Sequence, residues 1–235
     1  MFRGQRALSV IPARSGSKRL PGKNLQFVAG KPLIAWTLEA SLGARFIDRT
    51  VLSTDDQVLI ETVEQRGFSD FLVRPSALAT DDASMTSVLI HVIETLTKQG
   101  EDFAYLTLLQ PTSPLRTAGH IQQAFDLMEE KDAVGVVSVC STEHPKQWTG
   151  EIGEDGSLDQ FFRETELEMQ SQDFRPSYQI NGAIYIVLIE DFLAQKTLFL
   201  PTGMVAFVMD HQDSVDIDHK FDLHLADWLL TRRLA

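Results

Sequence analysis

Short runs of apolar and β-branched residues alternate along the chain with longer segments in which apolar residues recur at helical spacing. The runs that predict strands before residue 140 are 8–12, 50–54, 104–109 and 133–139. The segments that predict helices are 33–42, 57–65, 87–96 and 118–128. Helix N-caps are expected at the Asp55-Asp56 pair and at Thr117. Such alternation is typical of a mostly parallel sheet flanked by helices, so we predict an α/β fold.

The pattern changes in residues 143–175, which are polar, rich in Glu and Gln, and lack the alternation of strands and helices. After this segment the pattern predicts two strands and a closing helix, at residues 183–189, 205–209 and 220–234. A chain of 235 residues is long enough for one such domain with a small appendage. We therefore predict a main domain, residues 1–142 and 176–235, interrupted by an insertion.

Two explanations of the insertion remain open, a mobile lid or linker and an arm that packs on a second subunit. The segment is polar overall, as a linker would be. It also carries four large apolar residues, Trp148, Leu158, Phe161 and Phe162. Exposed groups of large apolar side chains are typical of interaction surfaces, so the composition favours the arm.

The charge and composition of the chain argue against several classes of protein. Its 21 basic and 33 acidic side chains give a formal net charge of −12, which repels nucleic acids and anionic membranes at long range. No apolar run approaches the about 20 residues that a membrane-spanning helix needs. The single cysteine, Cys140, excludes an internal disulfide, and the N-terminus lacks the pattern of a signal peptide. We expect a cytoplasmic protein without nucleic-acid or membrane partners.

The first predicted strand runs directly into a loop that holds four cations, Arg14, Lys18, Arg19 and Lys23, together with two glycines. Open α/β sheets bind ligands at the carboxyl ends of their parallel strands, and glycine leaves backbone N–H groups free for phosphate oxygens. A solvated basic turn is the alternative, but four cations on an acidic chain favour an anion-binding loop. Arg14 suits a two-pronged grip on a phosphate, while Lys18 and Lys23 act as point charges.

Two carboxylates near the C-terminus form a second candidate site. In an extended segment, Asp216 and Asp218 point to one side while Val215 and Ile217 point to the other. Carboxylate and phosphate oxygens suit Mg²⁺, which usually takes only one or two protein carboxylates. We interpret the pair as a candidate metal site, with a solvent-facing edge strand as the alternative.

Two further segments place polar side chains where a ligand would meet the sheet. Gln110, Thr112 and Ser113 follow the predicted strand 104–109 in a loop stiffened by two prolines. Asn181 and Tyr185 flank small residues that let a strand approach a ligand closely.

Taken together, these segments closely resemble the acylneuraminate cytidylyltransferases, which make CMP-activated sialic acids. The resemblance rests on motifs spread over nearly the whole chain: IPARSGSK at residues 11–18, PGKN at 21–24, LLQPTSPLR at 108–116, NGAIY at 181–185 and HQDSVDID at 211–218. It implies a Rossmann-like nucleotidyltransferase fold and a dimerisation insertion at 143–175. It also implies a dependence on Mg²⁺, or on Mn²⁺ in its place.

The resemblance assigns roles to the residues at matching positions. The CTP site would comprise Arg14, Ser15, Lys18, Lys23, Asn24, Arg74 and Ser84. Asp216 and Asp218 would bind the metal and complete the catalytic set formed with Arg14, Lys18 and Lys23. The sugar site would comprise Gln110, Asn181, Tyr185 and Lys146, the last from the neighbouring subunit of a homodimer.

One departure from the family pattern concerns the sugar carboxylate. Members that use N-acetylneuraminate usually carry an Arg-Gln pair before the NGAIY motif, and this Arg acts with a lysine of the insertion. Here Lys146 is present, but the matching pair reads Ser171-Gln172, which leaves Arg175 or Arg163 as the substitute. Pro21 and Gly22 are also similar to the 3-deoxy-manno-octulosonate cytidylyltransferases, whereas Asn24 and the carboxylate pair favour the sialic-acid branch.

The predicted reaction transfers CMP from CTP to the anomeric hydroxyl of a nine-carbon 2-keto sugar acid, N-acetylneuraminate or a related acylneuraminate, and releases pyrophosphate. We expect direct displacement, because no serine or cysteine nucleophile with a base is recognisable. Legionaminate, pseudaminate and 3-deoxy-manno-octulosonate are alternative acceptors. A non-catalytic nucleotide-binding module is the other class of function, although binding alone would require fewer charges.

Overall fold

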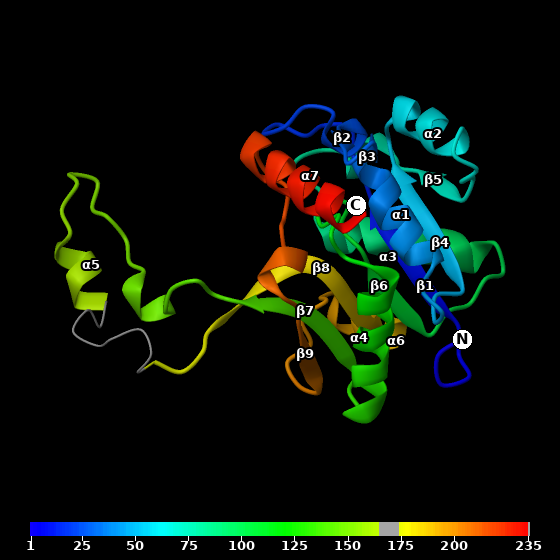
Figure 1. Ribbon diagram of the computed structural model, residues 1–235. Helices are drawn as coiled ribbons and strands as arrows, with labels where there is room; N and C mark the ends of the chain where they lie inside the picture. The colour runs from blue at the N-terminus through cyan, green and yellow to red at the C-terminus, as the bar shows by residue number, and fades with distance from the viewer. Residues whose placement is uncertain (165–173, 235) are drawn as a thin grey trace.

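The computed structural model describes residues 1–164 and 174–234, apart from the side chains of Arg163 and Glu164 (Figure 1). Seven strands of the described residues form one sheet: β1 (Ala7–Pro12), β4 (Arg49–Thr54), β5 (Phe71–Val73), β6 (Tyr105–Leu108), β7 (Gly135–Ser141), β8 (Tyr178–Leu188) and β9 (Met204–Val208). Their order across the sheet is β5-β4-β1-β6-β8-β7-β9. Neighbouring strands are parallel, except that β8 runs antiparallel to both β6 and β7.

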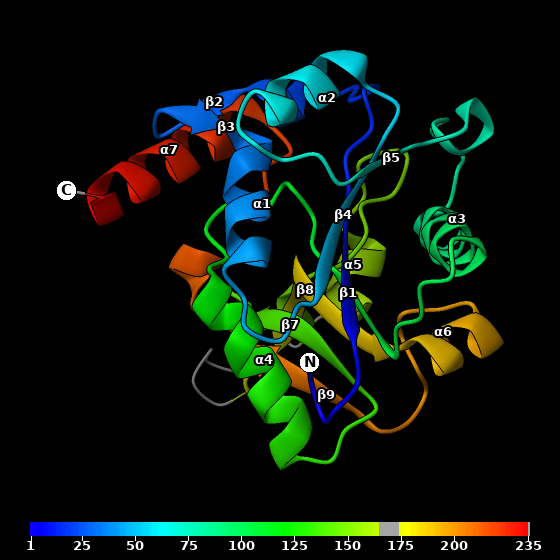
Figure 2. The ribbon, with the colours of Figure 1, turned by 90° about the vertical axis from the view of Figure 1, so that its right-hand side faces the viewer.

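Helices cover both faces of the sheet (Figure 2). One face is covered by α1 (Leu33–Leu42), α2 (Gln57–Glu64) and α4 (Ala118–Glu130), which share a core with β1 and β4. The other face is covered by α3 (Met85–Lys98) and α6 (Ile189–Gln195). The last helix, α7 (Lys220–Leu234), packs beside the small hairpin of β2 (Phe27–Val28) and β3 (Lys31–Pro32). The result is a three-layer α/β fold, and folds of this kind bind ligands outside the carboxyl ends of their central parallel strands.

The central strand β1 shows why its sequence is apolar without alternation. All of its residues are buried, because helices lie on both faces of the sheet. Its one polar side chain, Ser9, accepts a hydrogen bond from Ser41 Oγ at 2.7 Å, and Ser41 Oγ also lies 2.8 Å from Thr50 Oγ1. The buried hydroxyls therefore satisfy one another's need for hydrogen bonds. They hold β1 in place where it leads into the cation loop, residues 13–24, which carries Arg14, Lys18, Arg19 and Lys23.

The structure confirms the predicted α/β class and the four strands and four helices expected before residue 140. Thr117 caps α4 as expected, while Asp56 rather than Asp55 caps α2, accepting hydrogen bonds from the Val58 and Leu59 N–H groups. The predicted strand 183–189 is wrong in its bounds, since β8 begins at Tyr178 and Ile189 already belongs to α6. The pattern does not predict α6 or β5, because elements of seven and three residues are too short to show a clear period.

The described residues between β7 and β8 extend away from the sheet (Figure 1). They include a 3₁₀ turn, η3 (Lys146–Trp148), and the short helix α5 (Asp159–Glu164). Aromatic contacts join parts of this arm, since the Trp148 ring lies 6.2 Å from that of Phe174. Phe162 nevertheless stays 57% exposed. That the arm serves dimerisation stays a prediction.

The aromatic cluster under the N-terminus gives a test of the core. Phe2 is fully buried, and its ring centroid lies 5.0–5.2 Å from those of Phe46, Tyr105 and Phe125. Phe2→Ala should lower the free energy of unfolding by about 3–5 kcal/mol, because it removes contacts and leaves a cavity. The control Phe221→Ala, at a side chain that is 74% exposed, should change it by less than about 0.5 kcal/mol. Denaturant titration measures both, and equal losses would contradict the assignment of Phe2 to the core.

Candidate active site

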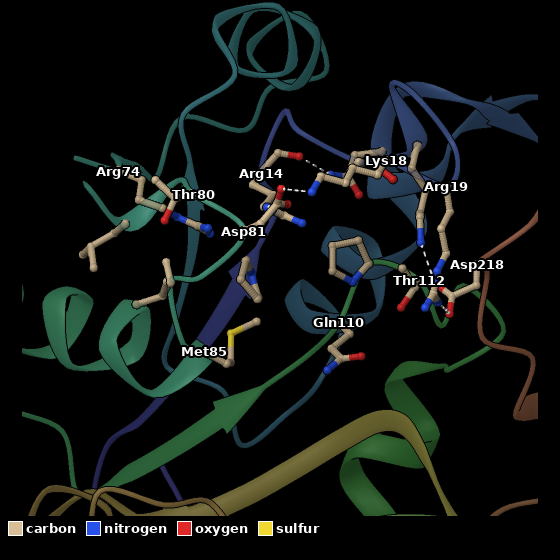
Figure 3. Close-up of a pocket in the computed structure, with 18 of the residues that line it drawn as sticks. Arg14, Lys18, Arg19, Arg74, Thr80, Asp81, Met85, Gln110, Thr112 and Asp218 are labelled. Carbon is tan, nitrogen blue, oxygen red and sulfur yellow. Dashed lines mark hydrogen bonds and ion pairs between the residues drawn. The ribbon is translucent and has the colours of Figure 1, made fainter. Parts of the chain in front are cut away.

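A cavity of about 520 Å³ opens where β1 and β6 end, between the cation loop, residues 74–88 and the segment 216–218 (Figure 3). Five residues of the predicted CTP site line it: Arg14, Lys18, Lys23, Asn24 and Arg74. Gln110, Asp216 and Asp218 line it as well. The fold thus gathers cations, carboxylates and an amide from segments far apart in the sequence, at the edge where α/β sheets bind ligands.

Two carboxylates pair with the four cations of the loop and offset half of their charge (Figure 3). Asp81 accepts ion pairs from Arg14 Nη1 and Lys18 Nζ, both at 2.5 Å. Asp218 pairs in the same way with Arg19 Nη1 at 2.6 Å and Lys23 Nζ at 3.0 Å. No motif in the sequence indicates a role for Asp81, and Arg19 is predicted only as one of the four cations of the loop. The four cations are therefore held close together on the cavity wall.

The loop itself is held by backbone geometry and by Asp55. Gly22 adopts a left-handed conformation (φ 62°) that turns the chain into the 3₁₀ turn η1 (Lys23–Leu25), where Asn24 Nδ2 donates to the Arg14 carbonyl at 3.3 Å. Ser15 does not line the cavity. Its N–H and Oγ both donate to the Asp55 carboxylate, at 3.0 and 2.6 Å, so Asp55 fixes the first turn of the cation loop.

Asp216 and Asp218 both face the cavity because Ile217 between them is fully buried. The Ile217 N–H donates to the Thr112 carbonyl at 2.8 Å, which anchors the segment. Asp216 is exposed by surface area, but neighbouring residues partly desolvate its carboxyl, which raises its pKa, and the influence of Thr112 opposes the increase. Burial would also raise the pKa of Asp218, but Lys23 and Arg19 outweigh it, so that this pKa is lowered. The two neighbouring carboxyls therefore differ in how readily they ionise.

The pair suits a hard divalent cation. Among the described residues, no group of three or more His, Cys, Asp or Glu side chains could enclose a metal ion. Mg²⁺ does not need such a cage, because it takes one or two carboxylates and completes its shell with water and substrate phosphates. Asp216 and Asp218 fit that chemistry, while a zinc site of protein ligands does not.

Arg74 and Ser84 take different places beside the cavity. Arg74 is buried, and its guanidinium donates to the carbonyl and Oγ of Ser53 while it lines the cavity wall. Burial lowers the pKa of Arg74, and the charge of Asp55 opposes that effect. Ser84 caps α3 by accepting a hydrogen bond from the Ser87 N–H. Ser84 does not itself line the cavity.

Of the residues predicted for the sugar site, Gln110 alone lines the cavity. Asn181 is buried, accepting from Ser138 Oγ at 2.6 Å and donating to Ser214 Oγ at 2.9 Å. Tyr185 is buried too, against Phe199. Their predicted contact with a sugar remains a prediction.

The basic residues predicted to meet the sugar carboxylate lie on or beside the arm. Lys146 and Arg175 are both exposed. The side chain of Arg163 and the pair Ser171-Gln172 lie outside the described residues. That Arg175 or Arg163 takes the place of the missing arginine therefore stays a prediction.

The whole chain resembles solved enzymes in its fold. A CMP:2-keto-3-deoxy-manno-octonic acid synthetase, solved in complex with CTP, matches with a TM-score of 0.71 at 18% identity, over 97% of this chain and 99% of its own. The sheet order, the helical layers and this likeness define a Rossmann-like nucleotidyltransferase fold.

Sequence comparisons narrow that class. Residues 8–202 match the family model described as "Cytidylyltransferase". A CMP-N,N'-diacetyllegionaminic acid synthase of Legionella pneumophila is 33% identical over 97% of this chain and 96% of its own. An N-acylneuraminate cytidylyltransferase of Escherichia coli O18:K1:H7 is 34% identical over 93% of this chain, which spans 51% of that relative. The chain therefore belongs to the cytidylyltransferase family.

No helix of the described residues is long and apolar enough to cross a lipid bilayer.

Asp55 provides a pH test of the loop that needs no ligand. Burial would raise its pKa, but the hydrogen bonds from Ser15 and the charge of Arg74 outweigh burial and lower it. The hydrogen bonds from Ser15 and the nearby charge of Arg74 therefore favour the charged carboxyl. Its contribution to stability is present above the ordinary pKa of about 4 and is lost as the pH falls through the lower native value. Asp55→Asn should thus reduce the unfolding temperature at neutral pH, and the gap to wild type should close in acid.

Asp56→Asn is the matched control, because asparagine caps a helix as well as aspartate does. It should leave the unfolding temperature nearly unchanged at neutral pH. If Asp55→Asn behaves like Asp56→Asn, or if its deficit does not shrink in acid, Asp55 does not fix the loop through its charge.

Proposed function

We propose that this protein transfers CMP from CTP to a nine-carbon 2-keto sugar acid and releases pyrophosphate. The observation that carries the proposal is a single cavity in which four cations and the Asp216 and Asp218 carboxylates meet, in a chain of the cytidylyltransferase family. Cations suit the triphosphate, and the carboxylate pair suits the metal that accompanies it.

The cation loop would bind the phosphates by exchanging partners. Arg14 and Lys18 would release Asp81 and grip phosphate oxygens, which carry the same sign of charge as the carboxylate. Asn24 and Arg74 line the same cavity and would help to hold the nucleotide. Because these pairs are exposed to solvent, exchanging one anion for another costs little free energy.

The carboxylate pair would hold Mg²⁺, or Mn²⁺ in its place. When bound, such an ion polarises phosphate oxygens and lowers the pKa of a coordinated hydroxyl. Asp216 and Asp218 would position it beside the phosphates, while Lys23 would keep its contact with the same segment. The protein thereby supplies position and charge, which dominate catalysis of such transfers.

The reaction would be an in-line displacement without a covalent enzyme intermediate. The anomeric hydroxyl of the sugar would give its proton to water, and its oxygen would form a bond to the α-phosphorus of CTP while the bond from that phosphorus to the bridging oxygen breaks. Pyrophosphate leaves with the bonding electrons, and Arg14 and the lysines of the loop would stabilise its charge. Gln110 would orient the sugar by hydrogen bonds through its amide.

N-acetylneuraminate or a related acylneuraminate is the proposed acceptor. The Escherichia coli relative, an N-acylneuraminate cytidylyltransferase, supports it. The Legionella relative is named for a diacetyllegionaminic acid and matches over nearly its full length, which supports legionaminate as the second candidate. Because Ser171 stands in place of the family's arginine, both acceptors remain candidates. Pseudaminate and 3-deoxy-manno-octulosonate are the further alternatives.

Pyrophosphate release with CTP and each of these acids tests the proposal. The wild type should turn over at least one nine-carbon acid, and Asp218→Asn should cut that turnover about 100-fold, because the metal is held less firmly, while CTP still binds. Asp210→Asn, on the same segment but not lining the cavity, is the matched control and should retain activity. Turnover with an aldose 1-phosphate, and with no 2-keto acid, would contradict the proposed acceptor.

The arm suggests that a homodimer shares its sugar sites. Lys146 is exposed on the arm, which extends away from the sheet of its own chain (Figure 1). In a twofold dimer, Lys146 of one chain would serve the cavity that holds Arg14 of the other. Light scattering that shows a monomer would reject this arrangement at once.

Mixed dimers test the shared site directly. Suppose that Arg14→Ala and Lys146→Ala are each nearly inactive alone, and that equal amounts are unfolded and refolded together. A mixed dimer would then have one doubly damaged and one intact site, so random pairing should restore about a quarter of wild-type activity. If Lys146 serves its own chain, every site keeps one lesion and no activity returns, although mass spectrometry detects mixed dimers.

A further inference from the structure

We propose that Arg116 is a positioning residue for the sugar side of the cavity, and that it acts through Gln110. The inference rests on the proposed function, because it assigns Gln110 to the sugar acid. Arg116 does not line the cavity and is only 1% exposed. It therefore cannot touch a substrate, and any effect on the reaction must pass through its neighbours.

The guanidinium of Arg116 joins three separate elements. Nη2 donates to the Gln110 carbonyl at 2.7 Å and to Thr37 Oγ1 on α1 at 3.1 Å. Nε donates to the carbonyl of Ala183 on β8 at 2.9 Å. A planar group with donors in fixed directions thus sets the distance between the loop after β6 and the neighbouring strand.

Gln110 is also held from the side of β8. Gly182 has a φ of +75°, and a Cβ built there would lie 2.9 Å from Gln110 Oε1. The amide of Gln110 therefore lies against bare backbone, next to the carbonyl that Arg116 binds. Arg116 fixes the main chain of Gln110, and Gly182 leaves room for its side chain.

The same loop continues to the carboxylate pair. The Thr112 carbonyl accepts the Ile217 N–H at 2.8 Å, and Ile217 lies between Asp216 and Asp218. A shift of the loop at Gln110 would therefore change the distance between the sugar side of the cavity and the candidate metal site. Displacements of about 1 Å in such an arrangement can cost a factor of about 100 in rate.

Stability does not explain the placement of Arg116. Within the described part of the chain it forms no ion pair, and its Nη1 has no hydrogen-bond partner. Burial lowers the pKa of its guanidinium to about 9, which reflects the cost of keeping a charge away from water. Well-packed apolar residues generally stabilise such a position at least as well. The geometry of its donors accounts for an arginine here.

Arg116→Lys tests the proposal, since lysine keeps the charge but cannot span the three acceptors. The KM for the sugar acid should rise about 10-fold or more, while the Kd for CTP, measured by calorimetry, should change less than about twofold. In a Gln110→Ala background, Arg116→Lys should have little further effect on the sugar KM, because the two residues act as a unit. Arg49→Lys, at an arginine that pairs with Asp70 away from the cavity, is the matched control and should alter neither constant.

Two further measurements keep the proposal testable if Arg116→Lys folds poorly or if no sugar acid is turned over. Thr37→Val removes one acceptor of the guanidinium and should raise the sugar KM in the same direction, whereas Thr37→Ser keeps the hydroxyl and should not. Hydrogen exchange needs no substrate. The amide of Ile217, which bonds the Thr112 carbonyl, should exchange faster in Thr37→Val than in Thr37→Ser.

Parallel losses of CTP and sugar binding, an additive double-mutant cycle, or unchanged exchange at Ile217 would each overturn the inference. Its failure is distinguishable from that of the proposed function. If the wild type transfers CMP to no sugar acid, the proposed function fails, and the exchange data alone decide whether Arg116 holds the loop.

Discussion

Repulsion among cations is the constraint on which the candidate site depends. Arg14, Lys18, Arg19 and Lys23 lie within ten residues of one loop, so their like charges repel one another. Asp81 and Asp218 hold two cations each, and both carboxylates come from segments distant in the sequence. Lys18 is 78% exposed in its pair, so such contacts contribute little to stability. Their effect is on shape, because they keep the loop folded over the cavity with its charges converging.

Behind the charged surface lies a polar framework centred on β8, the strand that runs against its neighbours. Asn181 connects Ser138 of β7 to Ser214, two residues before Asp216. Arg116 connects β8 to the loop that carries Gln110. Asn181 is tied through a serine hydroxyl to the segment that carries the carboxylate pair, and Arg116 is tied to the main chain of Gln110. The antiparallel strand β8 thereby connects the carboxylate side of the cavity with the side that holds Gln110.

The pattern of apolar and polar residues predicts those features that depend only on neighbouring residues in the sequence. β1 is buried on both faces and its sequence is continuously apolar, so its place in the sheet follows from the pattern. The common direction of Asp216 and Asp218 follows from alternation, because Ile217 between them enters the core. No pattern near Asp81 connects it with Arg14, since 67 positions separate them. Arg116 belongs to a recognised motif, yet the burial of its charge depends on acceptors from three elements and is visible only in the fold.

The arm, the described residues between β7 and β8, leaves large apolar side chains uncovered by the rest of its own chain. Ile152 and Phe162 are 66% and 57% exposed there, although aromatic contacts join other described parts of the arm. A segment this small cannot bury enough apolar surface to stabilise itself. In the dimer proposed above, a second copy would cover these exposed side chains and receive Lys146 at the same time. Folding of the arm and completion of the sugar site would then depend on one interface, so that a chain without its partner could hold the nucleotide and still lack part of the sugar site.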